Sequence, residues 1–292
     1  MTPKQLGLYL ATASIWGCTW FFILKVVLAF GGGGVALRAI LGSFALYLAA
    51  LAARRKLNFG AIGPLAFVGA TTVAGQLLGF NLATPMAGTA VTAILASTIP
   101  MFAMAIGHLR KVEHISRIGF IGLLLGFIGS VLIIGFPSVD YSLKFFLGCV
   151  LCLIGAISAA VGGIYTKSHL QNIGYWEQAI GSFFLGGLMM LPMFLINPPT
   201  HTPAPIDYFY LAVLSIISTG IGYIMYFRLV AEIGATPALT VEFLVTVIAV
   251  AIGAGFLGEH ISAIQFVGVA SILIGCALVL GLIPIKRPPA AI

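Results

Sequence analysis

Long apolar runs dominate the pattern of hydrophobic and polar positions in this chain. A membrane-spanning helix needs about 20 predominantly apolar residues, and seven runs of at least this length contain no Lys, Arg, Asp or Glu. The longest run, 57–109, must turn back on itself, and the Asn, Pro and Gly residues of NLATPMAG (81–88) predict the turn. Two further apolar segments carry Arg38 and Glu242. The pattern predicts ten helices, at 5–25, 35–53, 62–83, 86–108, 117–136, 145–167, 176–196, 207–230, 236–257 and 262–283.

The composition supports the same conclusion. Of the 292 residues, 61% are hydrophobic and only 7% are charged, and the mean hydropathy is +1.15. A soluble domain carries about 25% charged residues, so this chain cannot cover itself with a water-soluble surface. We therefore expect an all-α integral membrane protein with ten transmembrane helices, embedded in the lipid bilayer.

The basic residues predict an orientation. With the N-terminus inside, eleven of the fourteen Lys and Arg residues fall on the cytoplasmic side, where such residues are enriched. We therefore expect a multi-pass protein of the cell (inner) membrane with both termini in the cytoplasm. The net charge of +7 does not indicate a nucleic-acid partner, because the basic residues stand at the ends of the spans. Cys149 and Cys152 lie in a charge-free helix, which favours packing over a redox or metal site.

A repeated tetrapeptide reveals a duplication. EHIS occurs at 113–116 and again at 259–262, and eleven of 23 positions are identical between 113–135 and 259–281. The match predicts two repeats, 1–140 and 141–292, each with five spans. Because five is odd, the second repeat enters the membrane from the opposite side. Inverted repeats are typical of secondary transporters, in which one central site opens to each side in turn by alternating access.

The tetrapeptide also predicts the start of a helix. Ser262 with Gln265 forms the pattern of a capping box, and Ser116 occupies the same place in the first copy. Glu113 and Glu259 fit either a structural turn or a gate with an interhelical ion pair. Two GxxxG patterns, starting at Gly75 and Gly122, predict closely packed helix faces.

Several segments together resemble one known family. The segments are IWGCTW (15–20), ALRAILGSFAL (36–46), TAILASTIPMFA (92–103) and EFLVTVIAVAIGAGFLGEHIS (242–262). In order and spacing the chain is similar to EamA-like members of the drug/metabolite transporter superfamily, over nearly its whole length. The resemblance implies secondary export, or sometimes import, of small metabolites such as amino acids, without ATP or another cofactor. Consistently, the sequence contains no GxxxxGK[ST] phosphate loop.

Glu242 is the first candidate for a transport site. It lies inside an apolar span, where an ionisable residue is costly and usually faces a cavity. It would bind a proton or an amine. The alternative is a carboxylate that pairs with a neighbouring helix or reaches the cytoplasmic interface.

Charged residues near the span ends are candidates for gates. Arg38 stands just inside its span on the outer side and could pair with Glu259. On the inner side, Arg228 or Lys167 could play the same part for Glu113.

Polar and aromatic residues complete a candidate substrate pocket. Ser215, Ser218, Thr219, Gly222 and Tyr226 share one helical face. Their alternative role is interhelical hydrogen bonding and packing. The other candidates are Thr72, Gln76, Asn81, Trp16, Trp20, Tyr165 and Tyr223.

Three classes of function compete. The first is a transporter of small polar or amphipathic solutes, acting as a monomer or a homodimer. The second is a passive channel. The third is an intramembrane enzyme, which the histidines disfavour because all five lie at or near span ends or in loops.

Overall fold

The computed structural model describes the chain except for residues 19, 136–141, 197, 200–201, 257–261 and 284–292. All regular elements of the described residues are helical. In chain order they are α1 (Pro3–Cys18), α2 (Trp20–Phe30), α3 (Gly33–Ala52), α4 (Ile62–Val68), η1 (Gly69–Gly75), α5 (Gln76–Ala87), α6 (Thr89–Ala96), α7 (Ile99–Leu109), α8 (Arg117–Ile134), α9 (Leu143–His169), α10 (Tyr175–Met190), α11 (Met193–Ile196), α12 (Pro205–Val213), η2 (Leu214–Ile221), α13 (Gly222–Ile233), α14 (Ala235–Leu239), α15 (Val241–Phe256) and α16 (Ala263–Val279).

These helices match the ten expected spans. Seven described segments are long and apolar enough to cross a bilayer alone, and two shorter apolar helices, Ala235–Ile248 and Ala263–Val279, account for the last two spans. Helices α1 and α2 together cover the expected first span and lie on either side of residue 19, which is outside the described residues.

The apolar run 57–109 turns back at Gly88, the last residue of the segment 81–88 in which the turn was predicted. Helix α5 continues through Pro85 to Ala87, and the chain turns at Gly88, whose φ is +87°. Only glycine adopts such a φ without steric cost. The Asn and Pro residues of the segment therefore do not end the helix, and the glycine does.

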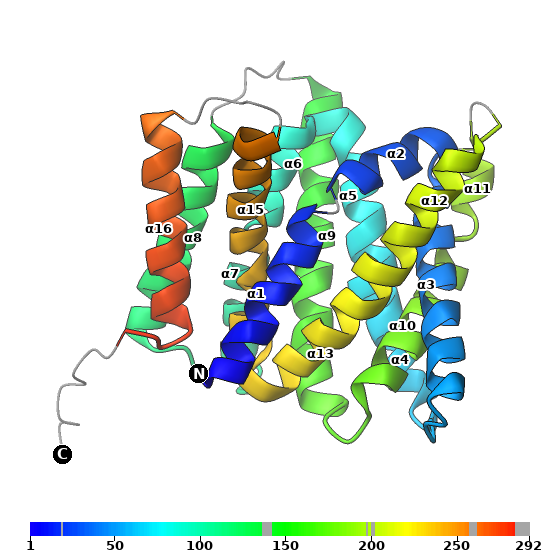
Figure 1. Ribbon diagram of the computed structural model, residues 1–292. Coiled ribbons are helices and arrows are strands. Elements are labelled where there is room, and N and C mark those ends of the chain that lie inside the picture. Colours follow the sequence, from blue (N-terminus) through cyan, green and yellow to red (C-terminus); the bar gives the residue numbers. More distant parts are fainter. Residues whose placement is uncertain (19, 136–141, 197, 200–201, 257–261, 284–292) are drawn as a thin grey trace.

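The two repeats run in opposite directions where they meet. Helices α8 and α16 pack side by side, and Figure 1 shows that one rises while the other descends. A Cβ atom added at Gly122 would lie 2.6 Å from the carbonyl oxygen of Gly275, and one added at Gly129 would lie 2.6 Å from that of Gly268. Gly122 corresponds to Gly268 in the repeat, and Gly129 to Gly275. Exchanging the two repeats therefore turns one contact into the other, as a two-fold axis in the membrane plane requires.

Local backbone features recur in the two repeats at the spacing of the two EHIS segments, which is 146 residues. The π-helical segments η1 and η2 lie at equivalent places in the two repeats. Gly234 repeats the positive φ of Gly88, and Gly281 that of Gly135. The repeat therefore extends beyond the region where the sequences visibly match.

The serine of each tetrapeptide caps the start of a helix, as predicted. The Ser116 hydroxyl accepts a hydrogen bond from the Gly119 N–H at 3.1 Å. Ser262 and Gln265 form the expected capping box at the start of α16.

Helix α3 has one face toward the interior of the bundle and one apolar face toward the outside. Leu41, Phe44, Leu48 and Leu51 are exposed on it and recur at helical spacing. In a bilayer they would contact lipid tails. Arg38, on the same helix, is buried inside the bundle.

Most of the chain's basic residues gather on one face. The N-terminal face consists of residues 1–4, 53–61, 110–116, 170–174 and 233–240, which lie at the lower side of Figure 1. Nine of the eleven basic residues expected on one side lie in this face or near it at helix ends, whereas 286 and 287 are outside the described residues. The nine are Lys4, Arg54, Arg55, Lys56, Arg110, Lys111, Arg117, Lys167 and Arg228.

The contact between α8 and α16 generates a prediction. Gly122→Ala places a methyl group against the Gly275 carbonyl oxygen, so the helices must separate, and we expect a loss of about 1–3 kcal/mol in stability. Thermal unfolding of the detergent-solubilised protein would measure the loss. Gly7→Ala is the matched control, since nothing lies within 4 Å of a Cβ atom there. Equal destabilisation by both substitutions would contradict the close contact.

Candidate functional site

A cluster of aromatic side chains occupies the centre of the bundle. The ring of Tyr223 on α13 lies 5.0 Å from that of Trp16 on α1 and 4.3 Å from that of Phe183 on α10. Tyr226, one turn further along α13, lies 5.7 Å from both Trp16 and Tyr223. We call Trp16, Phe183, Tyr223 and Tyr226 the aromatic cluster. It joins helices from both repeats, where inverted-repeat transporters place their substrate sites.

The π-helical segment η2 supplies polar groups next to this cluster. The Trp16 indole Nε1–H donates to the Ser218 carbonyl oxygen at 3.3 Å. The Thr219 hydroxyl accepts from the Arg38 Nε–H at 3.2 Å. π-helical turns are rare and often occur at functional sites, because their wider spacing redirects backbone and side-chain polar groups.

The close approach of Trp16 depends on Gly222. A Cβ atom at this position would lie 2.6 Å from the Trp16 Nε1 atom. The absence of a side chain at Gly222 therefore lets the indole reach the π-helical segment.

Arg38 lies deeper than expected. Helix α3 begins at Gly33, so Arg38 is about 7.5 Å along the helix from its start. Its side chain is only 8% exposed and faces η2 and Tyr223. Its hydrogen-bond partner in this structure is Thr219, and its pairing with Glu259 at an outer gate stays a prediction. Glu259, its expected partner, lies outside the described residues.

Glu242 lies at the start of α15, after the short helix α14. Its side chain is half-buried. Helix α15 packs against α1, where a Cβ atom at Gly17, next to Trp16, would lie 3.5 Å from the carbonyl oxygen of Val245, one turn from Glu242. Within the described part of the chain, the carboxylate has no hydrogen-bond or ion-pair partner. Glu242 and Arg38 therefore place opposite charges near the aromatic cluster.

Other predicted pocket residues divide into two groups. Ser218 belongs to the central site, and Gln76 is buried at the start of α5, where α5 packs on α9. Asn81 is half-buried further along α5. Tyr165 is separate, because its ring stacks on His169 at 4.1 Å near the N-terminal face. The side chain of Trp20 is outside the described part of the structure.

Glu113 has backbone partners in the other repeat. Its carboxylate accepts hydrogen bonds from the N–H groups of Ala235 and Thr236, the latter at 3.0 Å. These groups begin α14 directly after the turn at Gly234, so they have no partner within their own helix. The first EHIS segment thereby ties the first repeat to the interrupted ninth span.

The expected cationic partners of Glu113 bind elsewhere in this structure. Arg228 pairs with Glu232 at 2.6 Å on the same helix. The Lys167 ammonium donates to the Ala231 carbonyl oxygen at 2.8 Å. In this structure the N–H groups of α14 therefore satisfy the Glu113 carboxylate in place of a cation, and the gating role of these residues stays a prediction.

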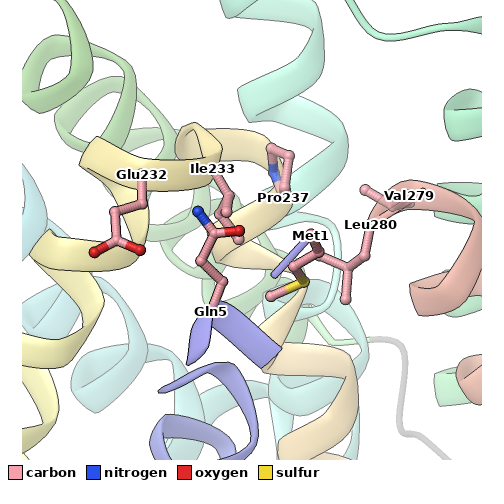
Figure 2. A pocket seen from close by; sticks show the side chains of 7 residues that line it. All are labelled: Met1, Gln5, Glu232, Ile233, Pro237, Val279 and Leu280. Atoms are coloured by element: carbon pink, nitrogen blue, oxygen red, sulfur yellow. The ribbon is translucent and has the colours of Figure 1, made fainter. Parts of the chain in front are cut away.

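Two pockets open on the N-terminal face. One, of about 270 Å³, is shown in Figure 2 and is lined by Met1, Gln5, Glu232, Ile233, Pro237, Val279 and Leu280. The other, of about 280 Å³, shares three of these residues and adds Glu113, His114, Ile115, Lys167 and Gly234. Both lie against the turn between α13 and α14. Among the described residues, no three His, Cys, Asp or Glu side chains are grouped so that they could hold a metal ion.

Sequence reasoning missed Phe183, the π-helical segments and the partners of Glu113. One signal for the turn before the ninth span was present in the sequence. Gly88 and Gly234 are separated by the same 146 residues as the two EHIS segments. The glycine turn between the third and fourth spans is therefore repeated between the eighth and ninth. Nothing in the sequence pattern marked Phe183 apart from other apolar residues.

Comparison with known proteins agrees with this architecture. A solved crystal structure matches the fold with a TM-score of 0.83, covering 97% of this chain and 98% of its own, at 14% sequence identity. The uncharacterized transporter YoaV of Bacillus subtilis (strain 168) is 23% identical over 308 residues, which covers 98% of this chain and 99% of YoaV. The uncharacterized inner membrane transporter YedA of Escherichia coli (strain K12) is 23% identical over 190 residues, or 65% of this chain and 61% of YedA.

The family model of the EamA-like transporters matches twice, at residues 4–135 and 146–281. The two matches cover most of the chain, one in each half. This chain is a multi-pass membrane protein and belongs to the EamA-like transporter family.

Proposed function

We propose that this protein moves a small zwitterionic solute, such as an amino acid, across the cell membrane by secondary alternating access. The observation that carries the proposal is the pair of opposite charges beside the aromatic cluster. Arg38 would bind the carboxylate of the solute, and Glu242 would bind its ammonium group. Trp16 and Tyr223 would contact its apolar part.

The energetics of burial support this assignment. A buried cation without an anionic partner is costly, and within the described residues Arg38 has no carboxylate partner. A guanidinium group binds a carboxylate through two parallel hydrogen bonds. A solute carboxylate would therefore compensate a charge that has no carboxylate partner in the described part of the chain.

The inverted repeat supports alternating access. Each repeat can take up the conformation of the other, which would expose the central site to either side in turn. We propose that the N-terminal face is cytoplasmic, since it gathers the basic residues, and that the usual direction is export. A passive channel is the second candidate, and saturable counterflow in vesicles would distinguish the transporter from it.

Arg38 provides the first test. Arg38→Gln removes the charge but keeps hydrogen-bonding groups toward Thr219. Because a hydrogen bond to a charged group contributes about 1.5–3 kcal/mol, we expect the KM to rise about ten- to a hundredfold. Counterflow of the twenty ¹⁴C-labelled amino acids in proteoliposomes would measure it. Arg228→Gln is the control, since Arg228 is exposed at the N-terminal face. If Arg38→Gln transports the same amino acid with an unchanged KM, Arg38 does not bind the carboxylate.

Glu242 provides the second test. Glu242→Gln keeps the size of the side chain but cannot carry a proton or a negative charge. If Glu242 couples protons, this variant should lose uptake driven by a pH gradient while it retains exchange. If Glu242 only binds the ammonium group, uptake and exchange should both decrease.

The control is Glu177→Gln, because Glu177 stands in the first turn of α10, where its carboxylate accepts a hydrogen bond from the Asn58 N–H. Wild-type values for Glu242→Gln in both assays would exclude either role.

Gly222 tests the aromatic cluster. Gly222→Ala places a methyl group 2.6 Å from the Trp16 Nε1 atom, so the indole must shift. We expect at least a tenfold loss of counterflow, as a small misplacement of a binding group can cost that much. Gly63→Ala is the matched control, because a Cβ atom there meets nothing within 4 Å. A wild-type rate in Gly222→Ala would show that the position of Trp16 is not important.

A further inference from the structure

Among the described residues, five buried hydroxyl groups have no hydrogen-bond partner, those of Thr72, Thr166, Ser182, Tyr226 and Thr236. Three of them come from one region of the bundle: Tyr226 on α13, Thr166 on α9 and Thr236 on α14, each at most 3% exposed. We call these three the hydroxyl layer. A buried hydroxyl without a partner costs about 1–3 kcal/mol, so native structures rarely retain one without a reason.

Several other threonines of this chain avoid that cost, although Thr72 does not. The hydroxyls of Thr12, Thr84 and Thr92 each donate to the carbonyl oxygen four residues earlier in their own helix. This is the usual solution for threonine in an apolar helix. Thr166 does not adopt it, and Thr236 is the second residue of α14 and has no such carbonyl in its own helix.

The three hydroxyl groups lie at one junction of three helices. A Cβ atom at Gly163 of α9 would lie 3.0 Å from the Tyr226 hydroxyl oxygen and 3.7 Å from the Ala235 Cβ atom. Thr166 follows Gly163 by three residues on the same helical face. Thr236 follows Ala235 directly.

The hydroxyl layer lies between the central site and the N-terminal face. The ring of Tyr226 belongs to the aromatic cluster. On the opposite side, Gly234 and Pro237, which flank Thr236 in the chain, line the pocket of about 280 Å³ together with Glu113. A solute that passes from the central site to this pocket would meet the hydroxyl layer.

Two carboxylates lie near the layer. Glu113 lines the pocket of about 280 Å³, and Glu242 stands at the start of α15, directly after the helix α14 that carries Thr236. Lys167 lines the same pocket, but its ammonium group donates to the Ala231 carbonyl oxygen at 2.8 Å. Glu113 also holds the N–H group of Thr236 at 3.0 Å. Three oxygen acceptors with two carboxylates nearby are complementary to an ammonium group, which has three N–H donors and a positive charge.

We propose that the hydroxyl layer is a transit site for the ammonium group of the transported solute, between the central site and the pocket on the N-terminal face. In the structure, Glu113 closes the route by binding the start of α14. When Glu113 releases Ala235 and Thr236, α14 can move, and the ammonium group can reach the pocket. The identity of the solute as an amine rests on the proposed function, but the binding of an ammonium ion to this layer does not require Arg38.

Binding of [¹⁴C]methylammonium to the purified full-length protein tests the site. The measurement uses the Glu242→Gln variant, so that the central carboxylate does not contribute to binding. In this background we expect Thr166→Val with Thr236→Val, and separately Tyr226→Phe, to weaken binding at least tenfold. Methylammonium has no carboxylate, so this measurement does not involve the role proposed for Arg38, and the test is separate from that of the proposed function.

A structural role predicts a different result. If the hydroxyls only stabilised the fold, the variants would have a lower melting temperature. Replacing a buried hydroxyl that has no partner by a group of the same shape should leave the melting temperature unchanged or raise it. Weaker binding with an unchanged or higher melting temperature therefore supports the transit site. Ser130→Ala is the control, because this buried hydroxyl donates to the Gly126 carbonyl oxygen, far from the layer. Undetectable binding to the Glu242→Gln protein, or equal affinity in all variants, would overturn the proposal. If the double valine variant does not fold, Tyr226→Phe alone decides.

Discussion

The close antiparallel contact between α8 and α16 is the constraint on which the rest of the structure depends. Lipid tails are as apolar as leucine, so helices in a bilayer associate mainly through close packing of small residues. Gly122 against Gly275 and Gly129 against Gly268 bring the two backbones together in this way. Because each contact is the symmetry mate of the other, this packing fixes the two repeats in inverted orientation.

The scaffold is symmetric, but its chemistry is not. The glycine turns and the π-helical segments occur in both repeats. At the same spacing of 146 residues, Ala96 corresponds to Glu242, Leu77 to Tyr223 and Phe80 to Tyr226. Only one repeat therefore supplies the carboxylate and the two tyrosine hydroxyls. A duplicated backbone that carries unduplicated side chains fits a single central site with two alternative exits.

Glu113 has a local structural role at the place where we propose a role in transport. The sequence suggested either a structural turn or a gate for this residue. In the structure its carboxylate accepts hydrogen bonds from the first N–H groups of α14 and so connects the two repeats. A negative charge at a helix start is favourable, and this one lies beside a pocket and the hydroxyl layer. The contact can open without breaking the fold of either repeat, since it joins them only through hydrogen bonds.

The sequence by itself determined the ten spans, the duplication and the serine caps of α8 and α16. These features depend on hydrophobic runs and short-range patterns, which are properties of neighbouring residues. Only the tertiary structure decided the depth of Arg38, the partners of Glu113 and the meeting of Trp16, Phe183 and Tyr223. Those residues come from distant helices, and hydropathy cannot distinguish an apolar face against lipid from one against protein. Because both environments are apolar, only the packed bundle determines which side chains face each other.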